Sequence, residues 1–174
     1  MANTNDGGMI VLLVQWVVDT LRALTYNDKP VFKLNVAGNA VDPKSVDIWK
    51  HQVGISKGGM EASSRYSPFA FVSSGDEKST REGGYDLRRV PDIRVLIGVD
   101  SKEDGVAQWG DAAHLGTSKI RDLVIDALDK KRSDDVNIPC DEFYYDSSLE
   151  ILDIPKCHWL QMNFNVGQMN EPED

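Results

Sequence analysis

Cysteine is scarce in this sequence, and basic residues are outnumbered by acidic ones. The two cysteines, Cys140 and Cys157, could pair in an oxidising compartment, but two unpaired thiols in a reducing compartment are the preferred interpretation. With 19 Lys and Arg against 28 Asp and Glu, the formal net charge is −9. Because binding to phosphates needs clustered Lys and Arg, this balance excludes a protein that wraps nucleic acid.

Long hydrophobic runs are also absent. The most apolar stretch near the N-terminus, residues 10–18, is short and contains Gln15, whereas a membrane-spanning helix needs about 20 apolar residues. No Lys or Arg precedes this stretch, so the basic start of a secretory signal is missing. The sequence therefore predicts a soluble protein with no membrane partner.

No metal-binding signature occurs. The three histidines, His51, His114 and His158, are far apart, and the sequence contains neither a His-x-x-x-His nor a Cys-x-x-Cys motif. Cys157 and His158 are neighbours on a predicted strand, so their side chains should point to opposite faces. We expect His158 to be a packed histidine with a hydrogen-bond partner. No metal ligand, cofactor, cofactor-binding residue or catalytic residue is predicted.

Two kinds of segment resemble binding loops only superficially. Acidic residues crowd one loop without the spacing of an EF-hand, and a solvated loop is preferred to a Ca²⁺ site there. The residues concerned are Asp100, Glu103, Asp104 and Asp111. The glycine-containing residues 56–59 and 82–84 match neither phosphate-binding glycine motif, so turns are predicted.

What the sequence does contain predicts a single α+β domain over residues 1–174, because this length can bury one core without disulfides or metals. Helical periodicity predicts helices over residues 10–24 and 115–131. Strands are predicted over residues 31–36, 68–72, 92–99, 149–154 and 157–166. We expect a mostly antiparallel or mixed sheet of about four to five strands, covered on one face by two helices. Leu123, Val124 and Leu128 should pack on this sheet.

The remaining segments carry weaker signals. Residues 40–67 are predicted to be an irregular insertion, and residues 1–8 and 168–174 to be flexible. Residues 73–91 form a long polar stretch, predicted to be a loop or a β-hairpin arm. Its dense mixed charges suit a polar interface with a neighbouring subunit or another partner. The candidate interface residues are Lys78, Arg81, Glu82, Asp86, Arg88 and Arg89.

This order of elements resembles the tail terminator proteins of long-tailed bacteriophages, such as the lambda minor tail protein U and the Mu-like proteins. The resemblance spans most of residues 9–166. It rests on the element order and on the texture of residues 90–98, VPDIRVLIG, and 116–123, GTSKIRDL. Residues 40–67 depart from the smaller members of the family.

The resemblance implies a structural virion protein that is not an enzyme. Such a protein forms a homo-oligomeric ring, expected to be a hexamer, on the last ring of the tail tube protein. The ring stops tube polymerisation and offers a joining surface to head-completion or neck proteins, with the sheath as a further candidate partner. DNA would only pass through the lumen, which acidic subunits would keep from sticking to it. The implied location is the head-proximal end of the tail in the virion, after assembly in the host cytoplasm.

Two other classes of protein stay open. Another neck, connector or baseplate protein would share the small α+β architecture and the lack of catalytic residues. A small enzyme or ligand-binding domain would instead require a pocket with converging polar groups. Asp111 and His114, at the start of the second predicted helix, are the candidates for that pocket. Finding them remote from any cleft would remove this alternative.

Overall fold

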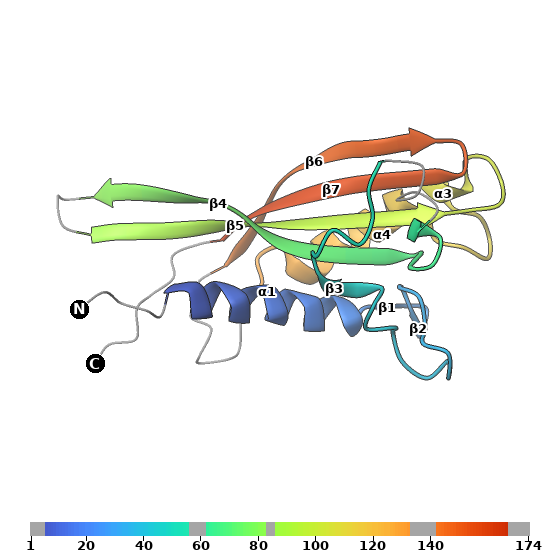
Figure 1. Ribbon diagram of the computed structural model, residues 1–174, viewed down its shortest axis with the longest axis horizontal. Helices are drawn as coiled ribbons and strands as arrows, with labels where there is room; N and C mark the ends of the chain where they lie inside the picture. The colour runs from blue at the N-terminus through green and yellow to red at the C-terminus, as the bar shows by residue number, and fades with distance from the viewer. Residues whose placement is uncertain (1–5, 56–61, 83–85, 133–141, 167–174) are drawn as a thin grey trace.

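The computed structural model describes residues 6–55, 62–82, 86–132 and 142–166, and its centre is a five-stranded mixed sheet (Figure 1). The strand order is β3-β4-β5-β7-β6. β3 is parallel to β4, and the other neighbouring pairs are antiparallel. The strands are β3 (Val46–Ile48), β4 (Phe69–Glu82), β5 (Asp86–Asp100), β6 (Phe143–Ile154) and β7 (Cys157–Val166). The predicted α+β class and sheet are confirmed.

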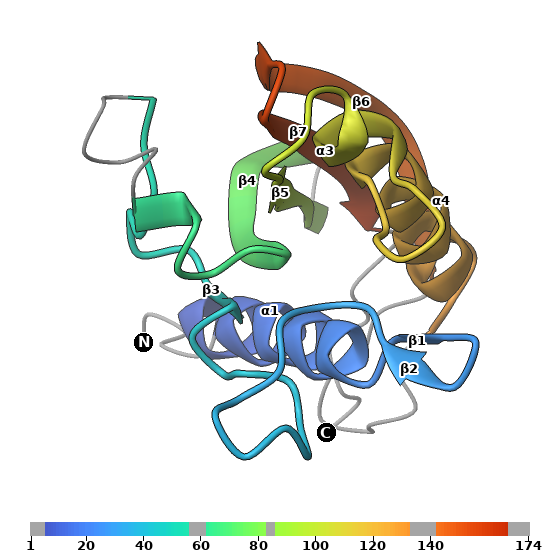
Figure 2. The ribbon, with the colours of Figure 1, turned by 90° about the vertical axis from the view of Figure 1, so that its right-hand side faces the viewer.

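Two helices, α1 (Asp6–Arg22) and α4 (Thr117–Leu128), pack against the same side of the twisted sheet (Figure 2). A four-residue helix, α3 (Val106–Trp109), precedes α4. A small antiparallel pair, β1 (Thr25–Tyr26) and β2 (Lys29–Pro30), follows α1. α1 begins inside residues 1–8, which the sequence predicts to be flexible. Residues 1–5 and 168–174 lie outside the described residues.

The core between the helices and the sheet follows the apolar periodicity of each element. In α1 the valines and leucines at helical spacing are buried, although β-branched residues are weak helix formers. Packing of this apolar face outweighs the low propensity. In α4 the buried stripe is Ile120, Val124 and Leu128, whereas Leu123 is only partly buried at its edge. Val124 and Leu128 are buried as predicted, and Leu123 packs against the same core as a partly buried residue at the edge of this helix face.

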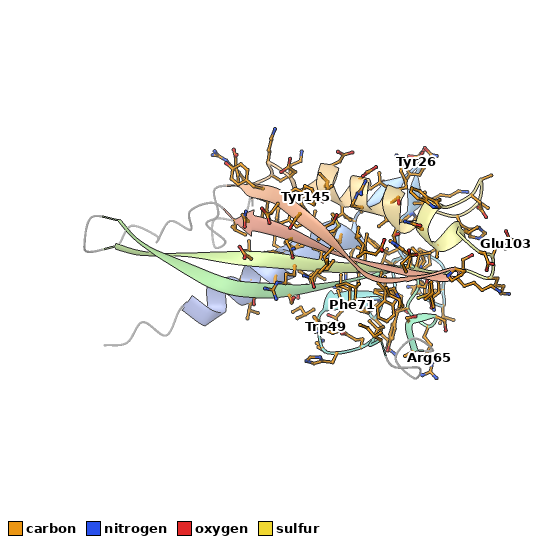
Figure 3. The ribbon with its side chains drawn as sticks, turned by 90° about the horizontal axis from the view of Figure 1, so that it is seen from above. Tyr26, Trp49, Arg65, Phe71, Glu103 and Tyr145 are labelled. Carbon is orange, nitrogen blue, oxygen red and sulfur yellow. The ribbon has the colours of Figure 1, made fainter. Side chains whose placement is uncertain are left out.

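The opposite face of the sheet carries a smaller aromatic core near the C-terminal end of β5. Phe69, Phe71 and Trp159 are buried there, with the Phe69 and Phe71 ring centroids 4.9 Å apart. Trp49 packs on Phe71 at a centroid distance of 5.9 Å, and Figure 3 shows these two rings together. Residue Gly98 lies beneath this cluster. A side chain at that position would meet the Phe69 ring at 2.2 Å.

Residues 31–36 do not form the predicted strand. Only an isolated bridge between Leu34 and Val41 occurs there, and the consecutive residues Val31 and Phe32 are both buried. A turn follows, in which the Gly38 N–H donates to the Asn35 carbonyl at 2.9 Å. Alternation alone gave a false strand because, among the described residues, this segment forms no ladder beyond that single bridge.

Residues 40–67, predicted to be an irregular insertion, contribute a strand to the sheet and a residue to the aromatic core. Val46–Ile48 forms the edge strand β3, paired with residues 70–72 of β4. The buried Val53 also joins the aromatic core. Residues 56–61 lie outside the described residues.

The other elements are of the predicted type, but several differ from the prediction in length. β7 has the predicted bounds, and the Pro155–Lys156 turn lies before it as expected. β6 begins six residues before the predicted strand, and β4 continues ten residues beyond residue 72. α1 and α4 both end before the predicted residues. Among the described helices, none combines the length and the apolar character needed to cross a membrane.

Candidate functional site

Residues 73–91 contain a two-stranded arm, which is the hairpin alternative of the prediction. β4 pairs with β5 from Phe69 opposite Gly98 to Glu82 opposite Asp86, with an irregularity between Ser74 and Glu77. We define the arm as the paired residues 77–82 and 86–91. It projects past the N-terminal end of α1, beyond the helix-covered sheet (Figure 1). The predicted turn at residues 83–84 lies outside the described residues.

The arm has two open edges within the described structure. On the β4 side, β3 pairs only with residues 70–72. On the β5 side, β7 pairs only with residues 92–100. Neither strand of the arm therefore has a second neighbour among the described residues. The unpaired backbone groups along such edges are ready to pair with another strand.

All six candidate interface residues lie on this arm. The register places Lys78 opposite Val90, Ser79 opposite Arg89, Thr80 opposite Arg88, Arg81 opposite Leu87, and Glu82 opposite Asp86. The fold thus brings six residues from two sequence segments onto one two-stranded ladder. Their side chains lie outside what the structure describes.

A cavity of about 1030 Å³ opens at the other end of the molecule, between the β1–β2 pair and the chain around α3. Figure 3 shows Tyr26 and Glu103, two of its lining residues, at this end. The Lys119 ammonium lies 4.9 Å from the centre of the Tyr26 ring, within the range of a cation–π contact. Trp109 also lines the cavity, with an exposed fraction of 71%.

Asp111 and His114 both line this cavity, so the ligand-binding alternative is not removed. Asp111 Oδ1 accepts the backbone N–H groups of Ala113 and His114, both at 2.7 Å, and lies 3.0 Å from His114 Nδ1. The Ala113 N–H, followed by the His114 side chain, lowers the pKa of Asp111. This carboxylate holds the imidazole through Nδ1, which leaves Nε2 as the ring nitrogen able to meet a ligand.

The prediction of a solvated acidic loop is wrong for Asp100, whose carboxylate is hydrogen-bonded within the fold. Its Oδ2 accepts the Ser63 hydroxyl at 2.6 Å, and its Oδ1 accepts the Cys157 thiol at 2.8 Å. Its half-buried position explains why it needs these partners. Glu103 and Asp104 are exposed as predicted. In the described part of the chain, no group of three or more side chains is arranged to hold a metal ion.

Cys157 is a buried free thiol of low nucleophilic reactivity. Burial, together with the Asp100 carboxylate, raises its pKa to about 12, so the nucleophilic thiolate is almost absent at neutral pH. The Ser63–Asp100–Cys157 cluster ties β5 and β7 to residues 62–67 and has a structural role. Cys140 lies outside the described residues.

His158 is the packed histidine that the sequence predicts. It is 3% exposed, with Nδ1 within hydrogen-bond distance of Thr117 Oγ1 and Nε2 3.0 Å from Glu150 Oε2. It packs near the helix side, whereas its neighbour Cys157 belongs to the aromatic core, so the two lie on opposite faces as expected. Thr117 is fully buried. This Thr–His–Glu chain of side-chain contacts links α4 to the β6–β7 pair.

Sequence reasoning missed the aromatic part of the cavity. Tyr26 and Trp109 are far apart in sequence, and neither belongs to a periodic pattern. Gly105 and Gly110, with φ angles of 79° and 77°, bracket α3. Trp109 is the exposed last residue of this short helix, and the two flanking glycines are the sequence signal for the helix ends around it.

A scan against models of known protein families finds no match, and a search of curated proteins finds no significantly similar sequence. The function of this chain therefore has to be inferred from its own residues and geometry.

Proposed function

We propose that this chain is a structural protein of a bacteriophage tail, namely a terminator that forms a ring on the end of the tail tube. In this role it stops tube polymerisation and presents a surface to head-completion or neck proteins. The sheath is a further candidate partner, and DNA only passes through the lumen. The observation that carries this proposal is the arm with its two open edges.

The arm is difficult to explain in a protein that acts as a monomer. An isolated two-stranded hairpin is at best marginally stable in water, and open strand edges promote unwanted pairing. An assembly protein avoids both problems when a partner covers the arm. Four basic and four acidic residues within residues 76–91 also suit a polar protein interface better than a buried core.

Shortening the arm tests this role directly. Residues 77–91 would be replaced by a tight Asn-Gly turn, which removes both strands of the arm and keeps the helix-covered sheet intact. We expect a folded monomer with an unchanged thermal transition but weaker ring formation and poorer capping of tubes. Light scattering measures the mass, and electron microscopy measures the length of tubes grown with each protein.

A matched control is the double substitution Glu103→Gln and Asp104→Asn, which changes exposed charges at the opposite end of the molecule. It should assemble and cap tubes like the parent. If the shortened protein also assembles and caps tubes like the parent, the arm has no part in assembly and the proposal loses its support.

A different neck, connector or baseplate protein is the first alternative, because it could use the same arm for assembly. The place of the protein in a particle distinguishes these possibilities. Labelling should mark the junction of tail tube and head for a terminator, and another part of the particle for the alternatives.

A ligand-binding or enzymatic domain is the second alternative, favoured by the presence of the Asp111–His114 pair on the cavity. Small carboxylates, phosphates and nucleotides can be screened by following the NMR signals of the His114 ring. Binding should shift these signals and should be weakened by Asp111→Asn. If no compound shifts these signals, the Asp111–His114 pair no longer supports this alternative.

A further inference from the structure

We infer that neighbouring copies join arm to arm: the open β4 edge of one arm pairs with the open β5 edge of the next, and the arms close into a continuous antiparallel barrel. The inference rests on the proposed ring and adds the contact that holds it together. The partner is a second copy of this chain, and the contact is a backbone ladder.

The open edges of both strands include the six paired positions of the arm, and among the described residues the β4 edge is open from residue 73 onward. β3 leaves the outer edge of β4 at residue 72, and β7 leaves the outer edge of β5 at Asp92. Within the described residues, 77–82 on one strand and 86–91 on the other are both without an outer neighbour. Pro91 lies where the β7 ladder stops, and it has no N–H to donate.

Strand direction favours pairing between different edges. β4 and β5 are antiparallel, so rotation about an axis along the arm places β5 of one copy antiparallel to β4 of the next. No shift of one copy along this axis is needed. Such head-to-tail contacts close into a ring when the rotation permits, and a closed barrel leaves no edge unpaired. Two-fold pairing of β4 with β4 would satisfy only one edge of each copy.

Charge also favours a contact between identical arms. The chain carries −9, but residues 76–91 contribute four positive and four negative charges and are neutral in sum. The rest of each copy is acidic, so two copies repel each other. A contact through residues 76–91 adds little to this repulsion. Opposite charges on adjacent strands stabilise a ladder, and like charges directly opposite destabilise it. The arm carries both signs on each strand. The basic residues of the arm are Lys78, Arg81, Arg88 and Arg89, its acidic residues are Glu77, Glu82 and Asp86, and Asp76 directly precedes it.

Disulfide cross-linking between copies tests the contact. In a Cys140→Ser background, single cysteines would be introduced at Ser79 or Thr80 on β4 and at Leu87 or Val90 on β5. Cys157 stays in place because burial keeps it protonated. β4 and β5 variants carrying tags of different mass are mixed, dissociated, reassembled and oxidised. Ser79 and Thr80 are neighbours and Leu87 and Val90 are three residues apart, so each pair of positions samples both faces of the ladder.

We expect covalent dimers that contain one β4 variant and one β5 variant, for at least one of the four combinations. Single variants alone should give few dimers. A Lys102→Cys protein mixed with the β5 variants is the control, since Lys102 is exposed at the cavity end. It should give no such dimers.

Two results overturn the arm-to-arm contact while leaving the proposed ring standing. One is ring formation without cross-links in any combination, and the other is a predominance of β4–β4 or β5–β5 dimers. A Cys140→Ser protein that forms no ring, in solution or on tube ends, overturns the contact and the proposed function together. The mass of the protein before oxidation separates these cases.

Discussion

At the scale of single residues, close contacts across the sheet leave little freedom for substitution. The aromatic core of Phe69, Phe71 and Trp159 lies directly over the backbone of β5 at Gly98. The Ser63–Asp100–Cys157 cluster fixes the neighbouring chain by hydrogen bonds to one carboxylate. Both features act by packing and by satisfying buried polar groups.

Gly98→Ala should destabilise the fold. The added Cβ would lie 2.2 Å from the Phe69 ring and 2.8 Å from the Trp159 ring, so the stacked aromatic side chains must move. Overpacking of this kind costs about 1–3 kcal/mol. Urea denaturation measures the loss. Gly54→Ala is the control, because a Cβ there meets nothing within 4 Å. Equal stability of the two variants would contradict this account of Gly98.

Cys157 should make the folded protein less stable in alkali. Its pKa is about 12 in the folded state and about 8.5 in an unfolded chain. Above pH 8.5 the unfolded chain therefore releases a proton that the folded protein keeps, so this contribution is complete below pH 8.5 and is lost as the pH rises towards 12. Denaturation midpoints of the parent and Cys157→Ser should diverge in this window. Parallel pH profiles would show that the thiol is not the cause.

At the scale of elements, the helices and the sheet are held by stripes of apolar side chains at helical or alternate spacing. α4 contributes Ile120, Val124 and Leu128 at intervals of four residues. β7 contributes Leu160, Met162 and Phe164 at intervals of two. The arm differs from both because its pairing continues after the apolar pattern has ended. Its ordering therefore depends on backbone hydrogen bonds and on what covers it.

Leu128→Ala should cost about 2–5 kcal/mol of unfolding free energy, because this side chain is fully buried against the sheet. Leu123→Ala, for which the sequence predicts the same range, should cost less because Leu123 remains partly exposed. Chemical denaturation of the two variants gives the comparison. A larger loss for Leu123→Ala would mean that α4 is rotated relative to the described packing.

Periodicity explains which elements could be predicted. β7 alternates over its whole length and α4 has a clear apolar stripe, so the sequence predicts both. β3 could not be found, because three residues are too short for a pattern and their partner strand lies more than 20 residues away. The length of β4 was hidden because polar residues continue the ladder. The sequence predicted Asp111 and His114 as pocket residues, but Tyr26 joins them only through the fold.

At the scale of the whole molecule, the two candidate sites lie at opposite ends. The open-edged arm extends one end of the sheet, and the cavity with Asp111 and His114 opens at the other (Figures 1 and 3). A subunit held by its arm would leave the cavity end accessible to a different partner. Because residues 76–91 are neutral in sum, the net charge of −9 belongs to the rest of the chain.

This charge distribution predicts how salt affects assembly. Copies that meet through arms of nearly balanced charge still bring acidic bodies together, and the repulsion between those bodies is long-ranged at low salt. Raising the ionic strength from about 0.01 M to 0.1 M shortens the Debye length from about 30 Å to about 10 Å. Body repulsion should fall more than the short-range backbone pairing of the arms, so rings should form at lower protein concentration.

Sedimentation velocity over a protein dilution series at both ionic strengths measures this shift. The arm-shortened protein is the control, since it should stay monomeric in both buffers. If salt instead dissociates the rings, ion pairs between copies dominate the contact, and the body charges are too far apart to matter. An arm of nearly balanced charge within an acidic chain predicts that salt promotes ring formation, because the charges of the arm nearly cancel while those of the bodies add.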